Sequence, residues 1–391
     1  MPHLLTRISQ WTLRSVLAVL TIAVCCLLLC SAYGDVVSPA TTVIPSFLGL
    51  AIGFVVLLSL AWAVVLLLLR SWRCLGALAV TWLIVALPVW RSCPLNMRGP
   101  IQPLTETSDG QAASHVDSLR VMSFNTRQMG AAHLARIKEK LPVMDLVRSS
   151  GADIVCLQEY SFAIGTSGHT EAELCEELRD IYPYYRYMSN ESSRHHNLGI
   201  ACFSKYPIVE AVPIDKRQKG YFSAMYYQLQ LGSRQIGLVN MHLQSNKLAK
   251  DDRILYDEMI EHFESDSLDR IRSGMMHSLA CAWRLRAYEA NVIRQFLLDH
   301  HPKEMPLLVC GDMNDTPVSY CARRLRSVGL TDTWQETGFG PGITYREHHF
   351  WFRIDHLLHS PQLRALSMHV RRDVTFSDHY PIEATYQLLP E

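Results

Sequence analysis

The amino-terminal quarter of the chain consists largely of apolar runs without a charged residue. These runs extend from Ser15 to Gly34, from Val36 to Leu69 and from Cys74 to Trp90. A helix that crosses the roughly 30 Å hydrocarbon core of a bilayer needs about 20 apolar residues, and about 17 is the lower limit. The pattern therefore predicts three membrane-spanning helices, over about residues 15–34, 44–69 and 74–90.

The first apolar run has a second interpretation, which is a cleaved signal peptide. Basic Arg7 and Arg14 precede it, and small residues lie around Ser31-Ala32. Two further apolar runs follow at once, however, and they favour a helical hairpin that packs against the first run. We therefore treat the first run as a retained span and leave its cleavage open.

Lys and Arg residues around the apolar runs predict an orientation. Arg7 and Arg14 precede the first run, Arg70 and Arg73 lie between the second and third, and the loop from Gly34 to Thr42 has neither Lys nor Arg. By the positive-inside rule the amino terminus is cytoplasmic and the chain after Trp90 is extracytoplasmic, although two arginines soon after Trp90 count weakly against this. The pattern predicts an integral, multi-pass membrane protein.

After a Pro- and Gly-containing linker over residues 92–117, the pattern becomes that of an α/β domain. A helix is expected over residues 141–150, and another carries apolar positions from Trp283 to Leu297 and ends before Pro302. Apolar runs predict strands over 119–124, 153–157, 198–203, 306–310, 354–359 and 382–388, and a hairpin of 221–231 and 235–243 turns at Gly232-Ser233. Many strands with few helices indicate two sheets packed face to face with helices outside.

Charge and cysteine content narrow the function classes. The chain has 37 basic and 37 acidic residues, so it lacks the global positive charge that dominates non-specific nucleic-acid binding. This balance makes a nuclease a less favoured hypothesis but does not exclude it. Its 11 cysteines form no CxxC pair and no zinc-like spacing. Buried apolar packing is the favoured role of Cys156, Cys202 and Cys310, while disulfides stay open in an oxidising compartment.

Six predicted strands end in polar groups that could carry chemistry. These segments are 123–127 with Asn125, 155–159 with Glu159, 239–245 with His242, 311–315 with Asp312 and Asn314, 353–356 with Asp355, and 377–379 with Asp378 and His379. Taken alone, Asn125 could cap a turn, Glu159 could be a solvated strand end and His242 could be a core histidine. Six such strand ends in one domain predict a shared cleft that binds a hard cation and a phosphate ester.

The order and content of these segments resemble the endonuclease/exonuclease/phosphatase superfamily over residues 119–388. The resemblance is carried by Asn125, Gln158-Glu159, Gly311-Asp312-Met313-Asn314 and Ser377-Asp378-His379. It implies a four-layer α/β sandwich of two mostly antiparallel sheets flanked by helices, over residues 118–391. The apolar runs, not the resemblance, add an all-α membrane anchor of three helices over residues 1–91. It also implies a divalent-metal-dependent phosphoesterase that hydrolyses a phosphodiester by in-line attack of water.

The same resemblance assigns a metal site. It makes Glu159 the principal ligand of Mg²⁺, with Asn125 and Asp378 near the same position. Oxygen ligands and one or two carboxylates are what Mg²⁺ takes in proteins, and Mn²⁺ can take its place.

The resemblance also assigns catalytic roles. Asp312 matches the residue that orients the attacking water, and Asn314 the amide that positions the phosphate and the nucleophile. His379 matches the histidine that contacts the scissile phosphate, and Asp355 the carboxylate that accepts its other N–H. His242 matches a histidine near the leaving group in deoxyribonuclease-like and sphingomyelinase-like members, where it acts as general acid.

Substrate and partners are less determined by the sequence. A membrane anchor favours a lipid or other surface-bound phosphodiester by proximity, and a nuclease acting on extracytoplasmic DNA or RNA is the alternative. A receptor or scaffold that kept the fold and lost chemistry would show gaps in the catalytic set, and there are none. Histidines and aromatics over 345–353, with His348 and His349, suit a substrate loop or ordinary loop packing equally well. Protein partners are not predictable.

Overall fold

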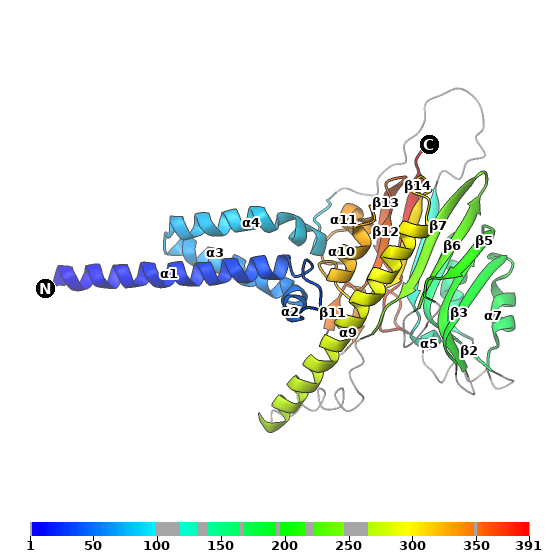
Figure 1. Cartoon of the computed structure of the whole chain (residues 1–391), viewed down its shortest axis with the longest axis horizontal. Coiled ribbons are helices and arrows are strands. Elements are labelled where there is room, and N and C mark those ends of the chain that lie inside the picture. The colour runs from blue at the N-terminus through cyan, green and yellow to red at the C-terminus, as the bar shows by residue number, and fades with distance from the viewer. Residues whose placement is uncertain are drawn as a thin grey trace.

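The computed structural model of the protein describes residues 2–97, 118–130, 140–164, 168–192, 196–215, 223–245, 265–347 and 350–390. Apolar helices project from one side of a two-sheet unit, which we name the catalytic unit after its expected function (Figure 1). Three sequence-based expectations fall partly or wholly outside the described residues. These are the pair His348 and His349, most of the predicted linker, and the first residues of the strand predicted over 221–231.

The apolar region folds into four helices, α1 (Pro2–Ala32), α2 (Ile44–Leu50), α3 (Ile52–Leu68) and α4 (Trp72–Ser92). Two stretches, Trp11–Ala32 and Trp72–Ser92, are long and apolar enough to cross a membrane, and α2 with α3 makes a third if that bent pair counts as one span. The pair is bent by 67°, whereas the sequence predicted one continuous helix over residues 44–69.

The bend has a packing reason. In α2, Phe47 places its ring edge-on against Trp283 of the catalytic unit, with 4.6 Å between ring centroids. Gly49 lies so close to the unit that a Cβ there would stand 3.5 Å from the Val318 carbonyl oxygen. The helix breaks at Ala51, so that α2 packs on the catalytic unit while α3 runs away from it.

The first sheet has six strands in the order β13-β14-β1-β2-β4-β3. Their bounds are β1 (Leu119–Asn125), β2 (Ile154–Ala163), β3 (Tyr184–Ser192), β4 (His196–Ser204), β13 (Leu363–Val370) and β14 (Ile382–Leu388). Only β1 and β2 run parallel, and the other neighbours are antiparallel.

The second sheet also has six strands, in the order β5-β6-β7-β8-β12-β9. They are β5 (Ile208–Pro213), β6 (Ser223–Leu231), β7 (Arg234–His242), β8 (Leu307–Asp312), β9 (Thr331–Asp332) and β12 (Asp355–His359). Again one pair is parallel, β7 with β8. A short ribbon of β10 (Tyr345–Glu347) and β11 (Phe350–Phe352) lies outside both sheets.

Apolar faces hold the two sheets together. Side chains of both sheets, such as Val121, Cys156 and Ile200 of the first and Leu238 and Cys310 of the second, form one buried cluster between them. The outer face of the first sheet is covered by α6 (Pro142–Ser149) and α7 (Glu171–Leu178), and that of the second by α9 (Ser265–His300) and α10 (Tyr320–Arg326). The expected four-layer sandwich of mostly antiparallel sheets is confirmed.

Candidate active site

The strand ends that bear the polar groups meet at one edge of the sandwich. In the first sheet the parallel pair β1 and β2 sets Asn125 beside Gln158, which precedes Glu159. In the second sheet the parallel pair β7 and β8 sets His242 beside Asp312, and antiparallel β12 sets Asp355 on the other side of Asp312. Parallel strands end at the same edge, so two parallel pairs in facing sheets bring these groups together.

Gly311 explains how Asp312 reaches this edge. Its φ is +134°, and a Cβ there would stand 1.9 Å from the Met241 carbonyl oxygen on β7. No side chain fits at that distance, so the position requires glycine. The close approach of the two backbones sets Asp312 next to His242, and the Leu243 amide donates to the Asp312 carbonyl at 3.0 Å.

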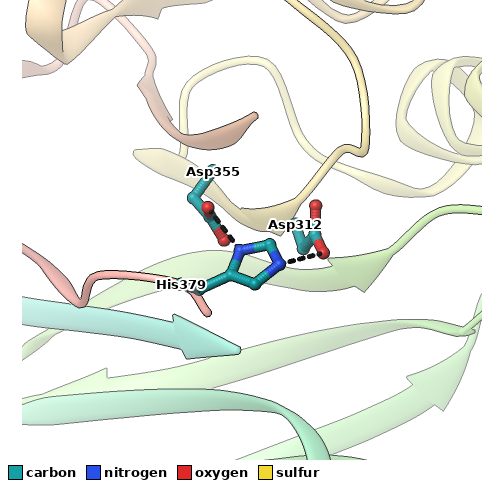
Figure 2. Close-up of side chains that lie close together, drawn as sticks. All are labelled: Asp312, Asp355 and His379. Carbon is teal, nitrogen blue, oxygen red and sulfur yellow. Dashed lines mark hydrogen bonds and ion pairs between the residues drawn. The ribbon is translucent and has the colours of Figure 1, made fainter. Parts of the chain in front are cut away.

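Asp355, His379 and Asp312 form a buried row (Figure 2). The Nδ1 atom of His379 lies 2.8 Å from Oδ2 of Asp355, and its Nε2 atom lies 3.7 Å from Oδ2 of Asp312. All three residues are at most 5% exposed. One potential ligand atom of each lies within 4.8 Å of the other two.

The row favours a charged histidine. Burial alone would lower the pKa of His379, but the carboxylates of Asp355 and Asp312 raise it well above its usual range. Burial raises the pKa of Asp312 above its usual value. The histidines His379 and His242 and the hydrogen bond from Asn125 lower this pKa in part. Because the Nδ1–H group of His379 donates a hydrogen bond to Asp355, its Nε2–H group points toward Asp312.

His242 approaches Asp312 from the other side. Its Nε2 atom lies 3.6 Å from Oδ2 of Asp312 and 4.0 Å from Oε1 of Glu159. Within the part of the chain that the structure describes, this buried nitrogen has no hydrogen-bond partner. A buried polar atom without a partner costs about 1–3 kcal/mol, so its presence at this edge is typical of a group reserved for a ligand.

The three predicted metal ligands lie next to this row. The Nδ2 atom of Asn125 donates to Asp312 at 2.9 Å and to Glu159 at 3.4 Å. The Ser377 hydroxyl donates to the Asn125 carbonyl at 2.9 Å and lies 3.4 Å from Oδ1 of Asp378, which places Asp378 beside Asn125. The Asp378 carboxylate also faces Arg127 at 3.8 Å.

Asn314 lies next to Asp312 and makes two hydrogen bonds there. Its side-chain amide donates to the Leu243 carbonyl at 3.0 Å, and its backbone N–H donates to Oδ1 of Asp312 at 2.8 Å. In this structure Asn314 therefore joins the loop after β8 to the loop after β7 and orients Asp312. The side-chain amide keeps a second N–H donor, so the contact with Leu243 leaves it able to bind a phosphate oxygen.

Strained backbone gathers at the same edge. Glu159 and Asn314 have φ values of 49° and 52°, and the three residues of the turn after β1, Arg127, Gln128 and Met129, have φ values of 48°, 55° and 65°. A positive φ in a residue other than glycine costs on the order of 1–3 kcal/mol, and such residues cluster at functional sites. Here Glu159 accepts a hydrogen bond from Asn125, and the backbone N–H of Asn314 donates to Asp312.

Several supporting residues were not predicted from the sequence. The Thr344 hydroxyl oxygen accepts hydrogen bonds from the backbone N–H groups of Ile354 and Asp355, at 3.1 Å each. These two bonds fix the start of β12. Between the sheets, the Gln158 amide donates to Asn240 at 2.7 Å, which ties β2 to β7 below the site. Thr344 does not stand out in the sequence. Gln158 belongs to a segment that carries the resemblance, but its partner Asn240 lies 82 residues further along the chain.

A further pair, Arg286 and Glu289 of α9, holds the loop that follows His242. The Gln244 N–H donates to Oε2 of Glu289 at 2.8 Å, and Nη1 of Arg286 donates to the Gln244 carbonyl at 3.0 Å. Both charged residues are at most 4% exposed, and Arg286 also lies 3.7 Å from Asp315. A signal was available, because both residues lie at helical spacing from the apolar Trp283, on the buried face of α9.

The oxygen donors of the site fit a hard divalent cation. Glu159 and Asp378 are partly exposed, with side chains 26% and 15% accessible, so a cation held there would keep some of its waters, as Mg²⁺ does. The buried row fits less well, because an ion between Asp355 and His379 would have to replace the hydrogen bond of 2.8 Å that joins them.

Comparison with known proteins agrees with this geometry. The model of the Endonuclease/Exonuclease/phosphatase family matches residues 122–379, which is more than half of the chain. The chain therefore belongs to the endonuclease/exonuclease/phosphatase family. The apolar helices are matched separately, over residues 14–93, by a domain of unknown function (DUF8431).

Solved structures with a similar arrangement are distant in sequence. An endonuclease/exonuclease/phosphatase from Beutenbergia cavernae is 19% identical with a TM-score of 0.48, and the match covers 70% of this chain and 72% of that one. The human Nocturnin catalytic domain with bound sulfate anion is 15% identical with a TM-score of 0.48, covering 70% and 95%. A family protein from Leptotrichia buccalis is 14% identical with a TM-score of 0.46, covering 69% and 100%. No curated protein matches the sequence.

Proposed function

We propose that the chain is a membrane-anchored, divalent-metal-dependent phosphoesterase that hydrolyses a phosphodiester by in-line attack of water. The observation that carries this proposal is the buried row of Asp355, His379 and Asp312, with His242 and Glu159 around it. Family membership supports cleavage of a phosphate ester, and the geometry supplies a group for each step of that reaction.

The row can handle both the phosphate and the water. A phosphodiester is an anion, so its attack by water needs positive charge at the phosphate and an acceptor for the proton of the water. His379 is held protonated by Asp355 and presents an N–H donor to a non-bridging oxygen. Asp312 faces the same space and would orient the water, since its other carboxylate oxygen, Oδ1, accepts the backbone N–H of Asn314.

His242 is suited to the leaving group. Its Nε2 atom points to the same edge without a hydrogen-bond partner among the described residues, and it lies 3.6 Å from Asp312. A protonated His242 would donate its proton to the departing oxygen as the bond to phosphorus breaks.

The cofactor of the proposed reaction is Mg²⁺, with Mn²⁺ as a substitute. Glu159 would be the principal ligand, and Asn125 and Asp378 lie close enough to contribute, Asn125 through its oxygen once its amide turns. When bound, the cation would neutralise charge on a non-bridging phosphate oxygen and on the leaving oxygen.

Membrane insertion and orientation are part of the proposal. Both α1 and α4 end at the catalytic unit, so three crossings would place the amino terminus and the catalytic unit on opposite sides of the bilayer (Figure 1). With Arg7 and Arg14 in the cytoplasm, the active site is extracytoplasmic. A phosphodiester in or near the membrane surface is then the substrate class within reach. A reporter fused to the carboxyl terminus tests the orientation, and a cytoplasmic signal would contradict it.

Hydrolysis of bis-p-nitrophenyl phosphate by the full chain in detergent tests the chemistry. We expect activity with Mg²⁺ or Mn²⁺, loss with EDTA, and a fall of at least about 100-fold in Asp312→Asn and His379→Gln. His359→Gln is the matched control. His359 is as buried as His379, but it lies at the end of β12 that is remote from Asp355. Activity that survives EDTA and both substitutions would refute the mechanism.

A panel of substrates then separates the classes. Sphingomyelin, phosphatidylcholine, single-stranded DNA and duplex DNA are compared on the same preparation. Cleavage of a lipid supports the membrane phosphodiester, whereas cleavage of DNA alone would replace it with a nuclease. No cleavage of any phosphodiester by the folded, metal-loaded chain would favour a receptor or scaffold.

A further inference from the structure

Arginines are concentrated where the apolar helices meet the catalytic unit. Arg91 lies in the last turn of α4, and Asp35 follows the end of α1. They face Arg323 and Arg326 of α10 and Arg353, which precedes β12. Figure 1 shows this junction at the left edge of the catalytic unit, where α4 approaches α11 (Thr333–Thr337) and α10.

Arg353 is the most deeply buried member of this junction, at 3% exposure. Its Nη1 atom donates to Asp332 at 2.7 Å, and its Nη2 atom donates to the Arg91 carbonyl at 2.6 Å. Its Nε–H is buried and has no hydrogen-bond partner among the described residues.

Two further arginines leave buried N–H groups without a hydrogen bond within the described part of the chain. The Arg326 side chain is 10% exposed, and its Nη1 atom donates to the Pro317 carbonyl at 2.8 Å. Its Nη2 atom forms an ion pair with Asp35 at 3.6 Å but no hydrogen bond to any described residue, and Nε of Arg91 has no hydrogen bond among them either. Of the junction's described acceptors, Oδ1 of Asp35 is also without one, so the donors outnumber it by three to one. A buried donor on a charged group is costly to leave without an acceptor, so three of them in one place indicate a ligand.

The charge balance indicates the sign of that ligand. Among the described residues, four arginines (Arg91, Arg323, Arg326 and Arg353) share the junction with two aspartates (Asp35 and Asp332), a formal excess of two positive charges. Burial, followed by the positive charge of Arg91, lowers the pKa of Arg326 to about 10, although Asp332 and Asp35 oppose this. Repulsion between the guanidinium groups is therefore only partly relieved within the chain.

We propose that this junction is a second anion site, separate from the active site, that binds a phosphate group through Arg91, Arg326 and Arg353. Guanidinium groups bind phosphate oxygens through paired N–H donors, which suits these three N–H groups better than a chloride ion would. Arg323, with 47% of its side chain accessible, marks the side from which the anion enters.

The phosphate can come from a lipid headgroup or from solution. Membrane-helix ends that carry Arg lie at the depth of lipid headgroups, and α1 and α4 both end at this junction. If the chain is inserted as proposed above, the headgroup of an anionic phospholipid can therefore reach the site. The site does not depend on hydrolysis, because no residue of the active site takes part in it.

Thermal unfolding of the full-length protein tests the site with two probes. In a neutral detergent, inorganic phosphate is compared with chloride at equal ionic strength. In nanodiscs, phosphatidylcholine alone is compared with phosphatidylcholine containing about a third phosphatidylglycerol. A ligand at about 100 times its Kd should raise Tm by about 5 °C or more.

Three variants make the test specific. Arg326→Gln should lose most of the rise in Tm, and Arg326→Lys should keep part of it. Arg323→Gln removes a neighbouring charge rather than a ligand, so it should lose a smaller part of the rise. Arg179→Gln, which removes the same charge at the exposed end of α7, should keep the full rise.

A rise with phosphate in detergent alone identifies a free anion, and a rise with phosphatidylglycerol alone identifies a lipid headgroup. The proposal is overturned if neither probe raises Tm, or if both Arg323→Gln and Arg326→Gln respond like the unsubstituted protein. Because the readout is unfolding, an inactive enzyme with an intact anion site remains distinguishable from a failed anion site.

Discussion

Replacing Glu289 with glutamine should stabilise the protein at alkaline pH. Glu289 is 4% exposed, and its carboxylate accepts the Gln244 N–H at 2.8 Å. Burial raises its pKa from 4.5 to about 7, although that hydrogen bond and the charge of Arg286 lower it in part. Ionisation of this side chain therefore lowers the free energy of unfolding.

The sign and size of the effect follow from linkage between protonation and folding. Below pH 4.5 the carboxyl is protonated in both states and costs nothing. As the pH rises toward 7 the unfolded chain ionises first, so stability falls, and above about pH 7 the full penalty applies. A rise in pKa from 4.5 to about 7 corresponds to about 3 kcal/mol.

Glutamine keeps the acceptor for the Gln244 N–H and removes the charge. We expect Glu289→Gln to unfold near the unsubstituted protein at pH 4.5 and about 5–10 °C above it at pH 8, measured by tryptophan fluorescence in detergent. Glu304→Gln, at an exposed position, is the control and should shift Tm by less than about 1 °C at either pH. Equal Tm values at pH 8 for Glu289→Gln and the unsubstituted protein would refute the reasoning.

Three further predictions concern other parts of the molecule. Asp355→Asn keeps the shape of the side chain but removes the charge that holds His379 protonated, so kcat should fall by about 100-fold to 10,000-fold while KM changes little, and an unchanged kcat would contradict the role. Gly311→Ala places a Cβ 1.9 Å from a backbone oxygen of β7, so Tm should fall by at least about 6 °C, whereas Gly232→Ala, with positive φ but nothing within 4 Å, should lose far less. Phe47→Ala removes the ring contact between α2 and α9 and should lower Tm by several degrees, whereas Phe54→Ala, which is 76% exposed on α3, should not.

Most of the framework could be predicted from local patterns. The run Ile382–Leu388 matches β14, and the hairpin around Gly232-Ser233 matches β6 and β7, because buried strands bounded by turn residues carry their signal locally. The half-exposed strands β3 and β5 were missed, because edge strands lack a continuous apolar run. The helix α7 was also missed, although Thr170 and Glu173 form a capping box that marks its start.

The candidate site was predictable as a set of residues, and its internal geometry was not. Asp312, Asp355, His379, His242 and Asn125 do lie at one edge, as the strand ends suggested. The prediction that Glu159, Asn125 and Asp378 hold the metal stays a prediction. The predicted role of Asn314 at the phosphate also stays a prediction, and the structure adds its contact with the Leu243 carbonyl, which joins loops that are distant in sequence.

By itself, the sequence determined which residues are apolar, where strands end and which ends carry acids, amides and histidines. These are properties of neighbouring residues, and the local periodicity of side chains records them. The tertiary structure decided which of those ends face each other, that α2 leaves the line of α3 to pack on Trp283, and that arginines from three distant segments converge at the junction. Such contacts depend on the register and packing of whole layers, and no short stretch of sequence specifies them.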